Sequence, residues 1–251
     1  VEQCWDALGR VVPVEETVMP AVYVNSAAIL KAFCGEHGGL TCTSSNARKV
    51  IEWSWARREK ILFFPDEHLG RNTANKMGIP REQMIVWDPF MPRGGNSVEA
   101  IKRAKLILWK GHCSVHQMFQ PSHVDYFRKQ YPDVKVIVHP ECHEDVVNKA
   151  DLVGSTEYII RTITAAPAGT TWAVGTELNL VNRLKHEQTD KKVFFLSSTV
   201  CQCATMYRID APHLCWALEN LADGHVVNRI VVPDDEKQWA KVALDRMMAL
   251  S

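Results

Sequence analysis

Short apolar runs alternate with longer amphipathic stretches along most of the chain. The apolar runs lie in the segments 21–25, 60–70, 104–113, 134–141, 152–163, 170–187 and 191–203. Runs of this length, followed by residues with helical spacing, predict β-strands that alternate with α-helices. Strands separated by helices form parallel sheets, so we predict an α/β fold with helices on both faces of short parallel sheets.

The second half of the chain repeats the order of features found in the first half. In each half a strand ends in a polar residue, a helix follows, a Ser/Thr turn opens another helix, and the last strand ends in cysteine. This recurrence predicts two copies of one αβα unit. The last cysteines of the two copies, Cys113 and Cys203, would then be equivalent.

Polar side chains follow the predicted strands. They are Asn25, Ser44, Ser45, Asp66, Cys113, His139, Glu141, Ser155, Thr156, Cys201 and Cys203. Ligands bind outside the carboxyl ends of the strands in open parallel sheets. We therefore expect these residues to line the facing edges of two related sheets, around one central site.

Two turns of small hydroxyl residues precede predicted helices, at 43–46 and 154–157. Helix N-terminal N–H groups suit a carboxylate or a phosphate, so a substrate with two anionic groups could use both turns. The alternative is that each hydroxyl only caps the helix that follows it.

The charge balance excludes some classes of partner. Lys plus Arg and Asp plus Glu are 29 each in 251 residues, so no overall field attracts nucleic acid or an acidic membrane surface. No apolar run reaches the 18 to 20 or so residues that cross a bilayer, and no basic-then-apolar signal opens the chain. We expect a cytoplasmic protein that binds small metabolites, without nucleic acid or membrane partners.

Eight cysteines in 251 residues are many for a cytoplasmic protein. In a reducing compartment a cysteine ligates metal, takes part in catalysis or packs as a small hydrophobic residue. Cys4 stands in the helical stretch that opens the chain, with no strand before it to complete a unit. We expect Cys4 to end a repeat that this chain lacks, so that three cysteines from three related units converge on one centre.

Seven motifs in a fixed order resemble those of the quinolinate synthase family. Quinolinate synthase is the second enzyme of de novo NAD biosynthesis in bacteria. The motifs are YVNSAAILKAF, TSSNA, PDEHLGRN, GHCSVH, HPE, GSTE and CATM. The resemblance covers essentially the whole chain and implies three pseudo-symmetric αβα domains with the active site at their common centre. On this view the chain divides into 1–17, the end of a missing first unit, 18–113 and 114–203, the second and third units, and 204–251, a C-terminal helical and strand segment that packs back on the missing unit.

The resemblance also implies a cofactor. Family members hold a 4Fe-4S cluster through three cysteines, which correspond here to Cys4, Cys113 and Cys203. One iron is left open, and an open iron can act as a Lewis acid on a substrate oxygen. Cys201 lies two residues from Cys203, and the match to Cys-x-x-Met favours Cys203 as the ligand.

By the same resemblance, the reaction condenses iminoaspartate with dihydroxyacetone phosphate to give quinolinate, phosphate and water. A hand-off of iminoaspartate from L-aspartate oxidase is also implied. The substrate-binding residues carried over are Tyr23, Asn25, Ser44, His116, His139, Glu141, Ser155 and Thr156. We expect Glu141 and Tyr23 to be catalytic, with the pKa of Glu141 tuned towards neutrality by a dry pocket near the metal.

Two other classes of function remain open on the sequence. One is a zinc-binding α/β protein, structural or hydrolytic, that uses Cys113, His116, Cys201 and Cys203. The other is a non-catalytic metabolite-binding protein. A nucleotide-binding fold is disfavoured, because the chain has neither a phosphate loop nor Gly-x-Gly-x-x-Gly.

Some segments have no predicted function. We expect 80–100, rich in proline and glycine, to be a loop elaboration. The motif at 65–72 has no role that the residues alone explain, so Asp66, His68 and Arg71 count as structural loop groups. Four further cysteines are expected to be buried in the core: Cys34, Cys42, Cys142 and Cys215.

Overall fold

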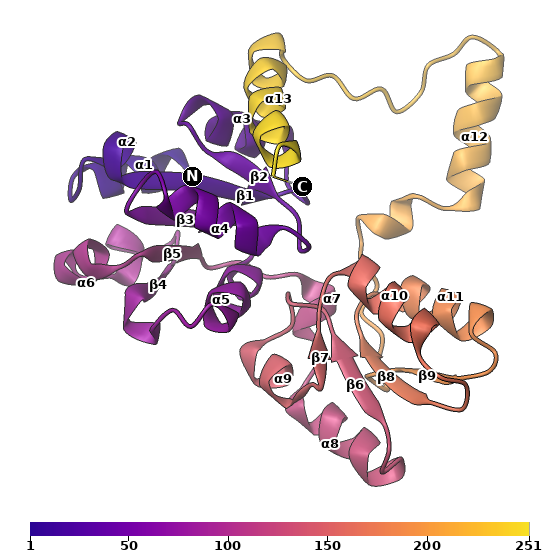
Figure 1. The fold of residues 1–251 in the computed structure, drawn as a ribbon. Helices are drawn as coiled ribbons and strands as arrows, with labels where there is room; N and C mark the ends of the chain where they lie inside the picture. Colours follow the sequence, from indigo (N-terminus) through magenta and orange to yellow (C-terminus); the bar gives the residue numbers. More distant parts are fainter. Residues whose placement is uncertain (251) are drawn as a thin grey trace.

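The computed structural model describes residues 1–250, which form two lobes that each surround a parallel sheet (Figure 1). The first sheet has the strand order β2-β1-β3-β5-β4 and the second β7-β6-β8-β9. The strands of the first sheet are β1 (Val18–Tyr23), β2 (Leu40–Cys42), β3 (Lys60–Phe64), β4 (Met84–Trp87) and β5 (Leu106–Trp109). Those of the second are β6 (Lys135–Val138), β7 (Leu152–Val153), β8 (Thr171–Gly175) and β9 (Lys192–Phe195).

Helices cover both faces of each sheet, so the predicted α/β class is confirmed. The helices up to the end of the first sheet are α1 (Glu2–Gly9), α2 (Val14–Thr17), α3 (Ala28–Glu36), α4 (Ala47–Trp55), α5 (Glu67–Lys76) and α6 (Val98–Arg103). After it come α7 (Ser114–Gln117), α8 (Pro121–Gln130), α9 (Glu144–Lys149), α10 (Thr156–Ala165), α11 (Leu178–Glu187), α12 (Ala211–Ala222) and α13 (Asp234–Met248). Short 3-10 turns are η1 (Arg81–Gln83), η2 (Pro92–Gly95) and η3 (Met206–Arg208).

Four hydrophobic clusters show which helices lie on which face. On the first sheet, α1, α3, α6 and α13 bury their apolar residues on one face, and α4 and α5 bury theirs on the other. On the second sheet, α8 and α9 cover one face and α10 and α11 the other. The strands are apolar almost throughout, as expected where helices cover both faces. Each lobe therefore has three layers.

The two sheets share a topology, apart from one added strand. The order β2-β1-β3-β5 corresponds to β7-β6-β8-β9, with all strands parallel. The added strand, β4, pairs with β5 at the edge of the first sheet. It lies within 80–100, so the prediction of a loop there was wrong: the apolar residues Met84–Trp87 extend the sheet instead.

The last helix of the described chain returns to the first lobe. Helix α13 packs on α3, and Arg246 Nη1 donates to the carbonyl oxygens of Gly35 and Gly39 at 3.1 and 2.7 Å. A Cβ at Gly35 would lie 1.9 Å from the carbonyl oxygen of Trp239, so only glycine allows this close approach. By contrast, α12 stands away from both lobes in Figure 1 and buries none of its residues.

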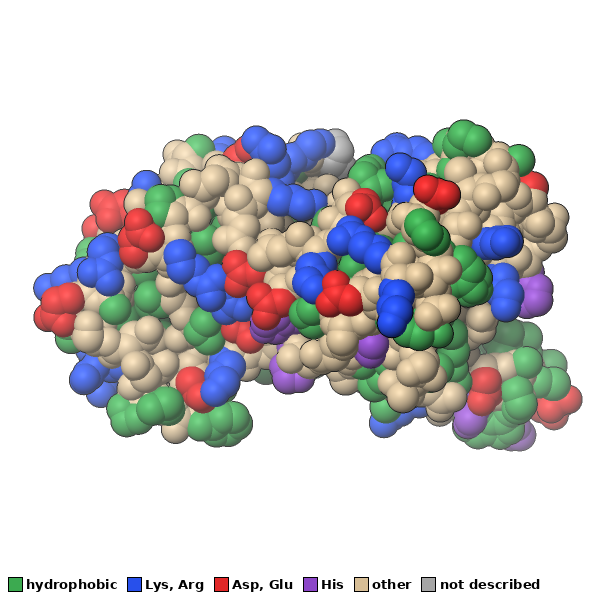
Figure 2. Space-filling model, turned by 90° about the horizontal axis from the view of Figure 1, so that it is seen from below, with side chains coloured by type: hydrophobic (Ala, Val, Ile, Leu, Met, Phe, Trp, Pro, Cys, Tyr) green, Lys and Arg blue, Asp and Glu red, His purple; other side chains and the backbone are tan. Residues whose placement is uncertain are grey.

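The two lobes meet along a polar boundary. Figure 2 shows charged and histidine side chains gathered where the lobes join. Helix α5 provides most of the hydrogen bonds there: Asn75 Nδ2 donates to Glu144 Oε1 at 2.7 Å, and Lys76 Nζ donates to the carbonyl of Val153 at 2.9 Å. No helix among residues 1–250 has the length and apolar character needed to cross a membrane.

Candidate functional site

The carboxyl ends of strands from both sheets meet at the lobe boundary. Tyr23 ends β1, Cys113 follows β5, and Glu141 follows β6. Tyr23 Oη donates to Glu141 Oε2 at 3.5 Å, although 118 residues separate the two along the chain. The strand pattern led us to expect this meeting for Cys113 and Glu141, which lie together, whereas Tyr23 was singled out only by the family resemblance.

Glu141 lies at the centre of the buried group. Its Oε2 atom is 3.1 Å from His139 Nδ1 and 3.4 Å from His116 Nδ1. The imidazole rings of His116 and His139 stack, with ring centroids 4.6 Å apart. His116 Nε2 is 3.2 Å from the hydroxyl of Thr176, which directly follows β8. One carboxylate thus contacts groups from the ends of both sheets.

Burial sets the protonation state of His116. Its pKa is lowered to about 3, chiefly by desolvation and also by the neighbouring His139, so the ring is neutral near pH 7. Its Nδ1 is buried and has no hydrogen-bond partner among the described residues. A buried nitrogen lone pair or N–H without a partner is costly, unless a ligand satisfies it.

The pKa of Glu141 differs from the expectation. Burial acts to raise it, but the hydrogen bond from His139, the electrostatic effect of the neighbouring His116 and His139 rings and the hydrogen bond from Tyr23 together leave it below the ordinary value. The prediction of a Glu141 pKa tuned towards neutrality was therefore wrong. The carboxyl that shifts upwards is Asp66, whose pKa burial and the charge of Glu141 raise to about 7.

Cys113 lies beside this group. Its Sγ and single donor atoms of His116 and Glu141 all lie within 4.8 Å of one another. Among residues 1–250, these three side chains are the cluster of His, Cys, Asp and Glu ligands that could hold a metal ion. Burial raises the pKa of the Cys113 thiol to about 11, so a bound cation would favour the thiolate that metals require.

The other two predicted cluster cysteines lie in different surroundings. Cys203 is half-buried in the segment after β9, and the nearby Cys201 N–H donates to Met118 Sδ at 3.3 Å. Met118 caps α7, the helix that begins directly after Cys113. This contact brings the Cys201–Cys203 segment to the Cys113 side of the second lobe.

Cys4 is not brought to Cys113. It is 3% exposed and packs in the cluster that contains Trp5, Phe33 and Phe64. Its helix, α1, lies far from α7 in Figure 1. Burial raises the pKa of the Cys4 thiol to about 12, which favours a neutral packing residue.

The two hydroxyl turns face one cleft of about 450 Å³ between the lobes. Ser155 lines the cleft and also caps α10, since its hydroxyl accepts from Tyr158 N–H at 3.3 Å. Ser44 also lines the cleft, but α4 begins after Asn46 without a side-chain cap, so the alternative that this hydroxyl only caps the helix does not hold there. Burial raises the pKa of Tyr23, and the Ser44 hydroxyl acts to lower it.

Two predicted substrate residues lie at the surface. Asn25 and Thr156 are both exposed. Thr156 adjoins the cleft as the first residue of α10. These two positions stay predictions.

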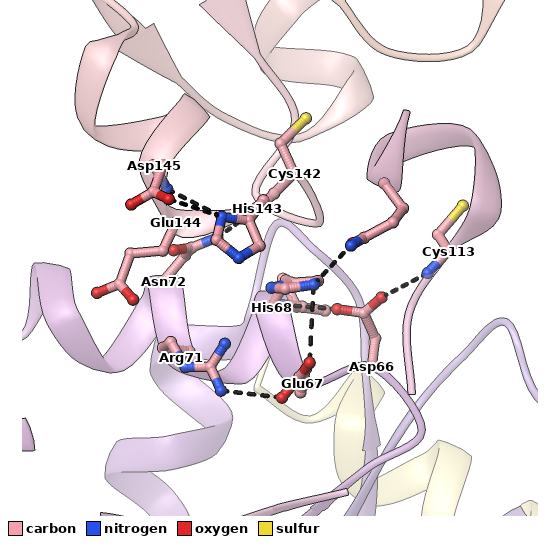
Figure 3. A network of polar contacts seen from close by, with 12 residues as sticks. Asp66, Glu67, His68, Arg71, Asn72, Cys113, Cys142, His143, Glu144 and Asp145 are labelled. Atoms are coloured by element: carbon pink, nitrogen blue, oxygen red, sulfur yellow. Dashed lines mark hydrogen bonds and ion pairs between the residues drawn. The ribbon is translucent and has the colours of Figure 1, made fainter. Parts of the chain in front are cut away.

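The motif at 65–72, which had no predicted role, makes several contacts at the site. Asp66 Oδ2 accepts from the Cys113 N–H at 3.1 Å, and His68 Nε2 is 3.0 Å from Gln117 Oε1 in α7. Asn72 reaches the second lobe beside Cys142 (Figure 3). The order Asp-x-x-x-x-x-Asn across a strand-to-helix junction was the available signal, because it puts a carboxylate at the helix start and an amide six residues further along the same helix.

The remaining cysteines follow the expectation with one exception. Cys34, Cys42 and Cys142 are fully buried, as predicted. Cys215 is exposed on α12, so the prediction of burial was wrong for this residue. Its helix presents an apolar sequence with no neighbour among the described residues that buries it.

Comparison with known proteins identifies the family of this chain. The profile of the quinolinate synthetase A protein family matches residues 2–249. The chain belongs to this family. Curated proteins named quinolinate synthase from Rhodopirellula baltica, Acidobacterium capsulatum and Nocardioides sp. are 57%, 56% and 55% identical to it over its full length. The chain spans 64%, 68% and 65% of those proteins, respectively, so the resemblance found in the motifs is confirmed for about two thirds of their length.

Proposed function

We propose that this chain carries the catalytic core of a quinolinate synthase. The reaction joins iminoaspartate to dihydroxyacetone phosphate and releases quinolinate, one phosphate and two waters, which balances all atoms. The observation that carries the proposal is the buried group of Tyr23, His116, His139 and Glu141 beside Cys113. The family membership of the chain supports the same reaction. The supply of iminoaspartate by L-aspartate oxidase is part of this proposal.

The donor atoms fit a metal cofactor. Cys113 offers sulfur and Glu141 oxygen, and the buried His116 Nδ1 lies 3.4 Å from Glu141 Oε2 without a hydrogen bond. Thiolates suit iron-sulfur clusters, and we propose that Cys113 and Cys203 hold a 4Fe-4S cluster. When bound, such a cluster supplies an electrophilic iron that assists loss of a hydroxyl group. For Cys4 to join as the third ligand, α1 would have to leave its hydrophobic cluster, so this ligand is the least supported of the three.

Proton transfer falls to Glu141 and Tyr23. A lowered pKa keeps Glu141 ionised near neutral pH, so its Oε2 atom can accept a proton from substrate. Burial raises the pKa of Tyr23, which keeps its hydroxyl protonated and able to donate. Because the Tyr23 hydroxyl already points at Glu141, the two form an acid–base pair. His139 orients the carboxylate through its contact at 3.1 Å.

The interlobe cleft suits anionic substrates. Arg48, Lys76 and Arg161 line it together with Ser44 and Ser155. Guanidinium and ammonium groups bind carboxylate and phosphate oxygens by charge-assisted hydrogen bonds. We propose that the substrate carboxylates and phosphate enter along this cleft, with Asn25 and Thr156 at its edge.

The proposal is tested by anaerobic purification of the chain, with iron, sulfide and zinc measured per polypeptide. We expect a brown protein that contains iron and sulfide, and loss of both in Cys113→Ser and Cys203→Ser. Cys215→Ser is the matched control, because this thiol is exposed on α12, and should keep the parent's iron. A colourless protein with one zinc would favour the zinc-binding alternative, and Cys4→Ser decides whether that thiol is a ligand or a packing residue.

A further inference from the structure

Helix α5 touches both halves of the proposed site. It follows β3 in the first lobe. Its residues contact α7 and the loop between β6 and α9 of the second lobe (Figure 3). Seven of its ten residues are buried, and several of these are polar. Buried polar groups are retained where they make specific hydrogen bonds. The partners of these groups therefore indicate what the helix does.

Asp66 connects the start of α5 to Cys113. Its Oδ1 accepts from the Leu69 N–H at 2.7 Å and so caps the helix, while its Oδ2 accepts from the Cys113 N–H at 3.1 Å. The side chain is 4% exposed. One carboxylate thus fixes the backbone of the proposed metal ligand to the end of a helix.

Asn72 connects the same helix to Glu141. Its Nδ2 atom donates to the carbonyl oxygens of Pro140 and Cys142, both at 2.8 Å. These two residues flank Glu141 on either side, so the amide holds the backbone around the catalytic carboxylate. Asn72 is 2% exposed, and both of its N–H groups are committed to the second lobe.

We propose that Asp66 and Asn72 are positioning residues that set the location of Cys113 relative to Glu141 through α5. The inference rests on the proposed function and adds residues to it. The two side chains are six residues apart, roughly 9 Å along a helix axis, and a helix is a rigid spacer. Residues that orient metal ligands or catalytic groups from behind commonly change metal affinity or activity by about 10- to 100-fold when removed.

The first experiment replaces Asn72 by alanine, with Asn75→Ala as the matched control. Asn75 lies one turn further along α5 and also bonds across the boundary, but to Glu144. Hydrogen–deuterium exchange of the metal-free protein should rise at least several-fold in the peptide that covers 139–143 in Asn72→Ala only. In the loaded protein, kcat should fall about 10- to 100-fold with a smaller change in KM and the same iron content.

The second experiment uses Asp66→Ser. A serine still caps the helix, because its hydroxyl can accept from the Leu69 N–H, but it is too short to reach Cys113 as well. Helix content should therefore stay at the parent value. Alkylation of Cys113 in the metal-free protein, followed by peptide mass spectrometry, should become several-fold faster, and retained iron should fall about tenfold.

The outcomes separate this inference from the proposed function. If the parent holds no cluster and forms no quinolinate, the exchange and alkylation measurements still decide whether the two residues position their partners. Equal exchange at 139–143 in Asn72→Ala and Asn75→Ala, or unchanged alkylation of Cys113 in Asp66→Ser, would overturn the inference. Should Asn72→Ala fail to fold, Asn72→Asp keeps the side-chain shape without the N–H donors and tests the same segment.

Discussion

Helices α5 and α12 reverse the usual relation between hydrophobicity and burial. Helix α5 has the polar sequence EHLGRNTANK, yet seven of its ten residues are buried. Helix α12 has the apolar sequence APHLCWALENLA, yet none of its residues is buried. Its side chains Leu214, Trp216, Leu218 and Leu221 are between 44% and 58% exposed. Burial is therefore decided by the neighbours that a helix finds in the fold, and only in part by its composition.

The difference has a functional meaning. The polar groups of α5 are paired with backbone and side-chain atoms of the second lobe, so the helix fixes one part of the molecule to the other. Helix α12 makes no comparable cross-lobe contacts among the described residues. We expect substitutions at the α5 boundary to change chemistry or stability, and matched substitutions on α12 to change neither.

The largest effect is expected at the carboxylate that this boundary positions. Glu141→Gln keeps the size of the side chain but removes its ability to accept a proton, so quinolinate formation should fall by about 10²- to 10⁴-fold. Steady-state rates on the iron-loaded protein measure this. Glu219→Gln on α12 is the control and should match the parent. A Glu141→Gln rate within twofold of the parent would exclude proton transfer by this residue.

The next effect concerns packing. Leu69 of α5 is fully buried, and Leu69→Ala should lower the free energy of unfolding by about 2 to 5 kcal/mol. Leu218 of α12 is 56% exposed, and Leu218→Ala should change the free energy of unfolding by less than about 0.5 kcal/mol. Denaturant titration followed by circular dichroism compares the two. Equal losses would mean that α12 is packed in solution and would remove the contrast between the helices.

A smaller effect is expected from the close approach of α13 to the first lobe. In Gly35→Ala the new Cβ would collide with the carbonyl oxygen of Trp239, so α3 and α13 must separate. We expect a loss of about 1 to 3 kcal/mol in the free energy of unfolding. Gly9→Ala, at the end of α1, serves as the comparison, because a Cβ there would lie 3.5 Å from Val14 Cγ1, an ordinary van der Waals contact. A loss in Gly35→Ala no larger than the loss in Gly9→Ala would argue against the α3–α13 contact.

The smallest effect is expected from the ion pair of Arg81 and Glu144, which joins the two lobes beside α5. Burial acts to raise the pKa of Glu144, but Arg81 and Asn75 lower it below the ordinary value of 4.5. A lowered folded-state pKa stabilises the protein above pH 4.5, and this contribution is lost as the pH falls through the folded-state value. Arg81→Ala should therefore cost up to about 1 kcal/mol at pH 7 and almost nothing near pH 3.

The exposed pair of Lys237 and Asp234 on α13 provides the comparison for that measurement. Lys237→Ala should leave the free energy of unfolding within about 0.5 kcal/mol of the parent at both pH values. Thermal or urea unfolding at pH 7 and pH 3 follows both variants. A pH-independent cost of Arg81→Ala would show that its contribution comes from packing.

Local sequence patterns determined most strands and helices, and the sheet edge at which the polar residues lie. Period and apolar runs predicted strands alternating with helices, and the position of polar residues after strands predicted that Cys113 and Glu141 would meet. Tyr23 was singled out only by the resemblance to the family. These predictions held because strand ends in a parallel sheet share one edge, whatever the sequence distance between them. The β4 strand was missed because its four apolar residues stand among prolines and glycines that signal a loop.

Tertiary structure alone decided the roles that depend on distant neighbours. Only the fold shows that Asn72 reaches the carbonyls beside Glu141, that Cys4 lies in a hydrophobic cluster, and that Ser44 leaves α4 uncapped. It also reversed the expected pKa shift of Glu141, because burial is opposed there by His139, His116 and Tyr23, which come from three different strand ends. Sequence spacing fixes which residues share an edge or a face, whereas desolvation and pairing depend on what the other lobe brings to that edge.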